Sequence, residues 1–369
     1  MKILIITSSG GSGHLLAAEA KRLEILASHP EAPIIIKDML SELQAKWLHP
    51  LVLHLWNKQQ RQGKTGWLRF LSSLLWLNNG LFFLPVVFRL YKLIMQENFT
   101  QIIDTQGSST KAALCALYLC HKRGKGPPWI DKLIVELPTK DTTYAFASLK
   151  SLGSPLRKRL RLHTTAPLLE AVSSQEEFWK KYTKMAPDQI VHGLPLRPHF
   201  LHPISYDPIE KMLGLKKEVH ITTIMLGSQP TPLSILPYVA AWIDTYKNKL
   251  TPHALVVLCC QDHALKTEIS YKKTPPHLHL IPLGHTSDEL IAPLLKYSKI
   301  TLTRSGGVTS HELLAVAEGQ ILIHSEAPRE KIMRGMPIWE EGNARYLLQH
   351  KNARMVTPTD SQQGLSIFS

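Results

Sequence analysis

The sequence predicts an α/β protein with two doubly wound domains, each built on a parallel sheet. Three observations support this fold class: short apolar runs alternate with helical patterns, the alternation restarts in the second half of the chain, and a proline-rich stretch separates the two halves. Apolar runs that are continuous, rather than alternating with polar residues, are typical of strands covered by helices on both faces. A chain of 369 residues is long enough for two domains of ordinary size.

The first domain is expected at residues 1–197. Its helices are predicted at about residues 13–27 and 108–120, each after an apolar strand. Strands connected through helices in this way pair in parallel. The predicted strands lie at residues 2–7, 33–37, 102–104, 132–137 and 160–163.

The second domain is expected at residues 217–369, where the same alternation returns. Between the domains, residues 193–208 contain four prolines, which fix φ and disfavour helix at the residue before each of them. We therefore expect an extended linker at residues 198–216. The strands of the second domain are predicted at residues 219–226, 254–260, 277–282, 299–303 and 320–324.

Basic residues concentrate in the first half of the chain. Residues 1–195 hold 25 Lys and Arg against 14 Asp and Glu, a net charge of +11, whereas the remaining residues hold 18 against 15, a net charge of +3. Within this half, residues 46–100 interleave basic residues with four tryptophans. This composition is typical of helices that lie on a membrane, and a buried helical hairpin is the alternative. The tryptophans are Trp47, Trp56, Trp67 and Trp76.

The charge and composition also limit the partners and the location. We expect an anionic membrane surface as a partner and no nucleic acid, because no nucleic-acid-binding motif is recognisable. No run of about 20 apolar residues could form a transmembrane helix, and the first residues do not form a signal peptide. We therefore expect a peripheral protein on the cytoplasmic side of a membrane.

The four cysteines lie in apolar runs, which argues against a disulfide framework. No metal-ligand spacing is present, so no metal ion is expected.

A turn rich in serine and glycine follows the first predicted strand and leads into a helix. It reads SSGGSGH and ends at His14. Glycine lets the backbone approach a ligand closely, and the amino-terminus of a helix attracts anions. The ordinary pKa of histidine lies near neutrality, so His14 is a candidate general base, and the alternative is a histidine that only caps the helix. The small residues before it are Gly10, Gly11, Ser12 and Gly13.

A second turn of small residues follows the strand predicted at residues 299–303. Its backbone N–H groups and hydroxyls could hold a diphosphate, and Glu312, one turn into the following helix, could accept the hydroxyl groups of a ribose. Glu312 could equally be an acidic residue that interacts with the helix dipole. The turn consists of Ser305, Gly306, Gly307, Val308 and Thr309.

Two further polar segments complete the set of candidate binding residues. One follows the strand at residues 219–226, and the other, near residue 340, could contact sugar hydroxyls. Ligands of doubly wound folds bind beyond the carboxyl ends of the strands, so we expect these segments to line a cleft between the domains. The residues concerned are Gly227, Ser228, Gln229, Glu340, Glu341 and Asn343.

In their order along the chain, these motifs resemble the glycosyltransferase family that contains monogalactosyldiacylglycerol synthases, diacylglycerol glucosyltransferases and MurG. The resemblance covers nearly the whole chain, and residues 193–198 and 340–343 resemble the glycolipid synthases more than MurG. The motifs are SSGGSGH, GLPLRPHF, LGSQ, LTRSGGVTSHE and EEGNARYLLQHKNA.

The resemblance implies the GT-B architecture, in which two Rossmann-like domains face each other across a cleft and the carboxyl-terminal domain binds most of the nucleotide-sugar. It also implies an inverting, metal-independent transfer of a hexose from a UDP-sugar to a membrane lipid, for which we expect diacylglycerol. The alternatives are an isoprenoid-linked acceptor, as for MurG, and a catalytically impaired membrane protein that binds a UDP-sugar. No cofactor is implied, since the UDP-sugar is a substrate.

The resemblance also assigns roles to individual residues. His14 matches the catalytic base candidate of the acceptor loop, and Glu312 matches the ribose-binding glutamate. Gly227 and Ser228 match the glycine loop of the second domain. The diphosphate loop is matched by Ser305, Gly306, Gly307 and Thr309. The segment that contacts the donor sugar is matched by Glu340, Glu341 and Asn343.

The chain departs from the family pattern at four places. Trp339 stands where glutamine is usual, which leaves the transferred sugar open, and Ser12 stands where glycine is common. Residues 104–107 replace a turn that usually holds a histidine. The chain ends soon after Asp360, which leaves little for the helix that usually crosses back over the first domain.

Overall fold

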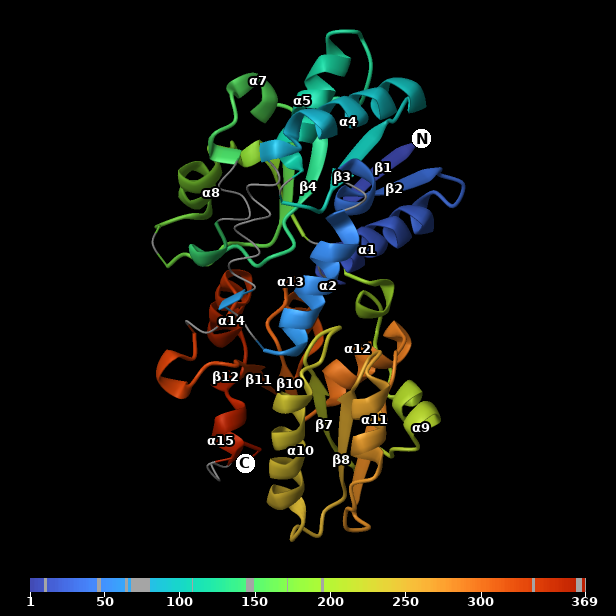
Figure 1. The fold of residues 1–369 in the computed structure, drawn as a ribbon, viewed down its shortest axis with the longest axis vertical. Helices are drawn as coiled ribbons and strands as arrows, with labels where there is room; N and C mark the ends of the chain where they lie inside the picture. The colour runs from blue at the N-terminus through green and yellow to red at the C-terminus, as the bar shows by residue number, and fades with distance from the viewer. Residues whose placement is uncertain are drawn as a thin grey trace. The chain divides into compact units, whose positions relative to one another are not determined.

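The computed structural model contains two parallel six-stranded sheets, one in each of two compact units (Figure 1). The first unit comprises Met1–Trp56 and Phe70–Pro198, and the second comprises Asn57–Arg69 and His199–Ser369. The predicted class, α/β with two doubly wound domains, is therefore confirmed. The structure describes residues 1–9, 12–44, 48–63, 66–67, 80–107, 109–143, 149–170, 172–193, 196–333, 336–362 and 367–368.

The first sheet has the strand order β2-β1-β3-β4-β5-β6. All neighbouring strands are parallel, so their carboxyl ends lie at one edge of the sheet. The chain adds β2 on one side of β1 and β3 on the other, which makes the β1–β3 pair the topological switch point. The strands are β1 Ile3–Thr7, β2 Ile34–Asp38, β3 Gln101–Asp104, β4 Ile130–Leu133, β5 Leu160–Thr164 and β6 Ile190–His192.

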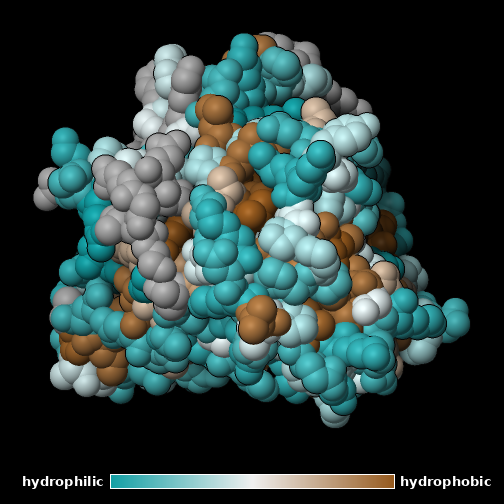
Figure 2. All heavy atoms as spheres, turned by 90° about the horizontal axis from the view of Figure 1, so that it is seen from below, coloured by the Kyte–Doolittle hydropathy of each residue, from teal (hydrophilic) through white to brown (hydrophobic). Residues whose placement is uncertain are grey.

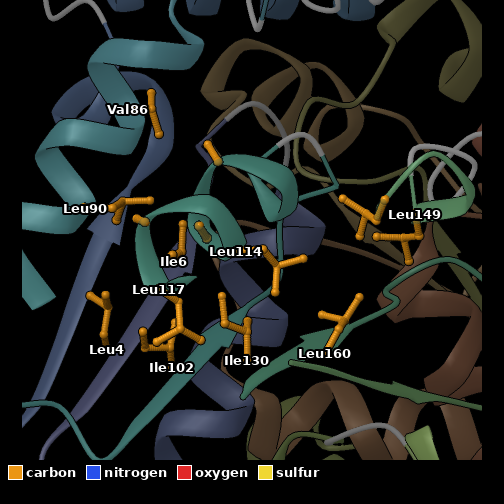
Figure 3. Close-up of a cluster of buried hydrophobic side chains, with 14 of the residues drawn as sticks. Leu4, Ile6, Val86, Leu90, Ile102, Leu114, Leu117, Ile130, Leu149 and Leu160 are labelled. Carbon is orange, nitrogen blue, oxygen red and sulfur yellow. The ribbon is translucent and has the colours of Figure 1, made fainter. Parts of the chain in front are cut away.

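Helices cover both faces of the first sheet. α1 packs on the side of Ile3 and Ile5, whereas α4 and α5 pack on the side of Leu4 and Ile6 (Figure 3). Alternate residues of β1 thus face opposite helix layers, as the two-residue period of a strand requires. The helices of this unit are α1 Ser12–Ser28, α4 Phe83–Glu97, α5 Thr110–His121, α7 Ser154–Arg157 and α8 Gln175–Thr183, with single turns at Met39–Leu43, Asp141–Thr143 and Pro187–Gln189. A further helix, α2 Leu48–Arg61, begins in the first unit, and its residues from Asn57 on belong to the second.

The second sheet has the strand order β12-β11-β10-β7-β8-β9, and its switch point is the β7–β10 pair. The strands are β7 His220–Met225, β8 His253–Leu258, β9 Leu278–Leu283, β10 Ile300–Thr303, β11 Gln320–His324 and β12 Ala353–Val356. The helices are α9 Asp207–Leu213, α10 Pro232–Tyr246, α11 His263–Ser270, α12 Asp288–Tyr297, α13 Gly307–Val316, α14 Ile338–His350 and α15 Pro358–Gln362, with single turns at Pro198–Phe200 and Arg329–Lys331.

The strands differ in detail from the sequence predictions. The strand predicted at residues 132–137 lies at Ile130–Leu133, because only these residues pair with β5. The sequence does not predict β6 and β12, because these edge strands are mostly half-buried and their sequences, IVH and ARMV, include polar residues instead of a continuous apolar run.

The expected linker at residues 198–216 is folded rather than extended. Tyr206, Ile209 and Leu215 are buried against the second sheet, and α9 forms around Ile209. Pro208 does not prevent this helix, because proline is tolerated in the first turn, where its missing N–H has no partner within the helix. The burial of three apolar side chains therefore makes this stretch part of the second unit.

Most of the described residues between 46 and 100 form the helices α2 and α4. α4 buries one face against the first sheet and exposes the other. Trp56 is buried and Trp67 is exposed, whereas Trp47 and Trp76 lie outside the described residues. None of the helices formed by the described residues is long and apolar enough to cross a bilayer.

Gly319, between α13 and β11, is expected to be essential for folding of the second unit. A Cβ at this position would lie 2.1 Å from the carbonyl oxygen of Ser298 and 2.5 Å from that of Lys299. Because main-chain atoms cannot move aside without disturbing β10, Gly319→Ala is expected to lower the free energy of unfolding by at least ~2 kcal/mol in urea unfolding. Gly284→Ala is the control, since its Cβ would meet only ordinary contacts of 3.7 Å or more. Equal effects of the two substitutions would contradict the prediction.

Candidate active site

The candidate base and the candidate phosphate-binding loops lie at the switch points of the two sheets, whereas Glu340, Glu341 and Asn343 lie on α14. In the first unit, His14 follows β1 and contacts the end of β3. In the second unit, residues 227–229 follow β7 and residues 304–307 follow β10. Loops diverge at a switch point and leave room for a ligand. Gly10 and Gly11 lie outside the described residues, and only the backbone of Ser12 is described.

The main chain at the end of β3 selects the tautomer of His14. The Nδ1 atom of His14 lies 2.7 Å from the carbonyl oxygen of Thr105, and the Thr105 hydroxyl donates to the carbonyl of His14 at 3.2 Å. A carbonyl oxygen only accepts hydrogen bonds, so Nδ1 carries the proton. Nε2 therefore keeps its lone pair and can accept a proton.

The surroundings keep the imidazole of His14 neutral. Burial, followed by the positive charge of Lys132, lowers the pKa of His14 from 6.5 to about 4. The carbonyl of Thr105 and the carboxylate of Asp104 act in the opposite direction and do not offset this decrease. At neutral pH the side chain is thus an uncharged base.

Lys132, whose positive charge lowers the pKa of His14, forms a buried ion pair with a residue of the neighbouring strand. Lys132 on β4 is 2% exposed, and its Nζ lies 3.5 Å from Oδ2 of Asp104 on β3. Asp104 is fully buried and accepts hydrogen bonds from the hydroxyls of Ser109 and Thr110, both at 2.7 Å. Burial lowers the pKa of Lys132, and the neighbouring Asp104 carboxylate opposes that shift. The pair places a fixed cation close to His14.

In the second unit, α13 begins directly after β10 and presents its amino-terminus at the carboxyl edge of the sheet. The first hydrogen bond of this helix runs from the N–H of Ser310 to the carbonyl of Gly306, at 2.8 Å. The N–H groups of residues 307–309 precede that bond and have no partner within the helix. Together with the helix dipole, they form the type of site that binds phosphate groups.

The turn before α13 is held by α14. Nη2 and Nε of Arg304 lie 3.1 and 3.2 Å from Oε2 of Glu340, and both side chains are buried. Ser305 donates its hydroxyl to the carbonyl of Glu340 at 2.7 Å, and Asn343 donates its amide to the carbonyl of Ser305 at 2.9 Å. Ser305, Glu340 and Asn343, which were predicted as ligand residues, thus use polar groups to position the turn. Their direct contact with a donor stays a prediction.

The other predicted donor residues differ in their exposure. Glu312 is 1% exposed and interacts with other protein groups. Oε1 of Glu341 lies 3.3 Å from Nη2 of Arg345. Thr309 is partly exposed. Contacts of these side chains with a ribose or a hexose stay predictions.

The glycine loop after β7 adopts a conformation that requires glycine. Gly227 has a φ of 85°, in the left-handed region that glycine adopts without strain. Ser228 is exposed, and Oε1 of Gln229 accepts a hydrogen bond from Nε of Arg61 at 2.6 Å. The loop therefore places two polar side chains at the carboxyl edge, one of which binds the end of α2.

Sequence reasoning missed a buried polar chain that ends at Glu326, just after β11. His324 lies between the hydroxyl of Tyr238, 2.9 Å from its Nδ1, and Oε1 of Glu326, 2.9 Å from its Nε2. The Ser234 hydroxyl lies 2.9 and 2.7 Å from the two oxygens of Glu326. Burial opposes ionisation of Glu326, but the bonds from His324 and Ser234 and the charge of Arg304 lower its pKa to about 2. Glu326 is thus a permanent negative charge at this edge.

Lys132, Arg304 and Glu326 share a signal that the sequence analysis did not use. Lys132 lies within a buried strand, and Arg304 and Glu326 lie one and two residues beyond the ends of apolar strands. A charged side chain at such a position is close to the core, so it needs a partner or a function.

Comparisons with known proteins identify the fold. No protein-family model and no curated protein matches the chain. MurG from Acinetobacter baumannii matches with a TM-score of 0.53 and 13% identity, over 100% of this chain and 89% of that chain. Arabidopsis thaliana UGT89C1 complexed with UDP-L-rhamnose matches with a TM-score of 0.55 and 10% identity, over 99% and 88%. Phytolacca americana UGT2 complexed with UDP-2-fluoro-glucose and pterostilbene matches with a TM-score of 0.53 and 10% identity, over 99% and 89%.

These structures share two Rossmann-like α/β domains with this chain, which therefore has the GT-B fold, as the sequence analysis expected. Among the described residues, no group of three or more His, Cys, Asp or Glu side chains is arranged to hold a metal ion. Metal independence of a reaction stays a prediction.

His14 is expected to remain neutral down to about pH 4. Since the unfolded chain takes up this proton near pH 6.5 and the folded chain near pH 4, protonation favours the unfolded state, and the free energy of unfolding falls as the pH is lowered through that range. NMR titration of labelled histidines, with His14→Gln to assign the signal, measures the midpoint. A midpoint near 6.5, or an identical pH dependence of unfolding in His14→Gln, would contradict the prediction.

Proposed function

We propose that the protein is an inverting, metal-independent glycosyltransferase that moves a hexose from a UDP-sugar to a membrane lipid, with diacylglycerol as the acceptor. One observation carries the proposal: the two switch points hold complementary groups, a neutral imidazole at one and an anion-binding helix terminus at the other. The imidazole can accept the proton of a hydroxyl group, and the helix terminus can hold a diphosphate. The glycosyltransferases among the similar structures support this reaction class.

The proposed donor site lies in the second unit. The turn at residues 304–307 is already fixed by the bonds between Arg304, Ser305 and α14, so ligand binding needs little reorganisation there. Negative charge develops on UDP as its bond to the sugar breaks, and the oriented N–H dipoles at the start of α13 would stabilise that charge. The complexes of similar proteins with UDP-L-rhamnose and UDP-2-fluoro-glucose support a UDP-sugar as the donor class.

The first unit supplies the proposed base. Nε2 of His14 would accept the proton of the acceptor hydroxyl as its oxygen bonds to the anomeric carbon, while the bond from that carbon to the UDP oxygen breaks. The proton stays on His14 and the electron pair of the broken bond leaves with UDP. Because the oxygen would attack the face of the anomeric carbon opposite UDP, the configuration at that carbon would be inverted. The proposal requires that His14 and the bound UDP-sugar act on the same acceptor hydroxyl.

A lipid acceptor is supported by an apolar stripe at the start of α4. Leu84 and Phe88 are both 63% exposed, and their spacing of four residues puts them on one side of α4, with Lys92 one turn further. Leu81, just before the helix, is 72% exposed. Exposed apolar residues also occur elsewhere, as at Leu250 in the second unit, which is 95% exposed, and Figure 2 shows hydrophobic residues scattered over the face it draws. The helical spacing and the positive charge of residues 1–195 favour a membrane surface.

The reaction is tested by UDP release. UDP-glucose, UDP-galactose and UDP-N-acetylglucosamine are each mixed with diacylglycerol vesicles, and one of them is expected to give lipid-dependent release of UDP and a glycolipid. His14→Ala is expected to reduce transfer by about 10²- to 10⁴-fold, because the general base is lost, and to leave UDP binding unchanged.

His29→Ala is the matched control, since this histidine lies on the surface just after α1. Unchanged turnover in His14→Ala would remove His14 from the mechanism. Turnover only with an isoprenoid-linked lipid would replace diacylglycerol as the acceptor, and UDP binding without turnover on any lipid would favour the impaired, sugar-nucleotide-binding protein.

Glu312→Ala is expected to weaken UDP binding about tenfold, because a carboxylate that accepts ribose hydroxyls is lost. Isothermal titration calorimetry with UDP measures the affinity, and thermal unfolding checks that the variant is folded. Glu318→Ala is the control, since the Glu318 side chain is 69% exposed just beyond α13. Equal affinity of the two variants would count against the assignment of Glu312.

A further inference from the structure

The carboxyl-terminal end of α2 belongs to the second unit, although it lies far from that unit in the sequence. Nε of Arg61 donates to Oε1 of Gln229 at 2.6 Å, and the hydroxyl of Thr231 lies 3.4 Å from the carbonyl oxygen of Gln60. The turn after the helix passes close to Glu326. None of the motifs in the sequence analysis includes these α2 residues.

These contacts place the end of α2 across the carboxyl end of β10. Gln229 and Thr231 follow β7, whereas Glu326 follows β11. In the sheet, β7 and β11 are the two neighbours of β10, about 10 Å apart. A segment that contacts the loops after both strands therefore spans the position where β10 ends and the turn at residues 304–307 begins.

The turn at residues 304–307 lacks positive charge of its own. The guanidinium of Arg304 is paired with Glu340, and Glu326 adds a second carboxylate close to Arg304. The amino-terminus of α13 contributes roughly half an elementary charge. A diphosphate bound at this turn would therefore need a further cation.

We propose that the end of α2 forms one wall of the donor site and that Arg61 is the cation that binds the diphosphate there. The inference rests on the proposed function. Arg61 is exposed, and its bond to Gln229 uses Nε, so the two Nη atoms can point to an anion. A guanidinium binds phosphate oxygens with two parallel hydrogen bonds, and its charge would stabilise the departing UDP.

Gly63 fixes the position of this wall. It has a φ of 63°, and a Cβ at this position would lie 3.0 Å from Cδ of Glu326. Glu326 cannot move aside easily, because Ser234 and His324 hold its carboxylate. Any side chain at residue 63 would thus push the end of α2 away from the sheet edge, and Arg61 with it.

The test compares ligands with and without phosphates. Isothermal titration calorimetry measures the affinities for UDP, uridine and inorganic pyrophosphate in the full-length protein. Arg61→Gln is expected to weaken UDP and pyrophosphate binding about 10- to 100-fold and to leave uridine binding unchanged, and Arg61→Lys to restore part of the loss. Lys58→Gln, which removes an exposed cation one turn earlier in α2, is expected to change the UDP affinity by less than about twofold.

A second pair of variants tests the position of the wall. Gly63→Ala is expected to weaken UDP binding, whereas Gly66→Ala, whose Cβ would meet no described atom within 4 Å, is not. Normal UDP binding by Arg61→Gln, or an equal loss of uridine and UDP binding, would overturn the inference and leave the proposed function intact. Failure of the unchanged protein to bind UDP would instead overturn the proposed function, and the role of Arg61 with it.

Discussion

Parallel pairing of the strands decides where chemistry can take place in this protein. It brings all carboxyl ends of a sheet to one edge, and the reversal of strand order separates two neighbouring loops at that edge. His14 lies at the start of the helix that follows β1, and Thr105 follows β3. The loops after β7 and β10 hold Gln229 and Arg304. Every candidate group therefore depends on the strand order, because another order would place these loops next to different strands.

Buried charges prepare the two sites in different ways. Arg304 and Glu340 form an ion pair at 3.1 Å whose charges cancel, so the pair fixes the turn and adds little net charge to the site. Removal of one partner from such a buried pair typically costs about 3–5 kcal/mol of stability. Lys132 and Asp104 are 3.5 Å apart, and the effect of Lys132 on His14 exceeds that of Asp104. The incomplete compensation of this second pair adds to the effect of burial, which is the main reason that the imidazole stays neutral.

The fold could be predicted from the sequence because continuous apolar strands and small-residue turns are local signals. The positions of His14 and of the turn before α13 followed from the same signals. The roles of Ser305 and Asn343 in positioning that turn could not, since they depend on bonds across 35 and 38 residues. The bond between Arg61 and Gln229 spans 168 residues, and a solvent-exposed arginine on an amphipathic helix gives no sign of such a partner.

The low pKa of His14 has a consequence for the proposed reaction. A base with a pKa of about 4 is always available at neutral pH, but burial and the neighbouring charge of Lys132 destabilise its protonated form. Transfer of a proton to it becomes more favourable when negative charge develops nearby, and in the proposed reaction the departing diphosphate would supply such charge. Proton uptake by His14 would then be coupled to the breaking of the sugar–UDP bond, so that the acceptor hydroxyl is not activated in the absence of the donor.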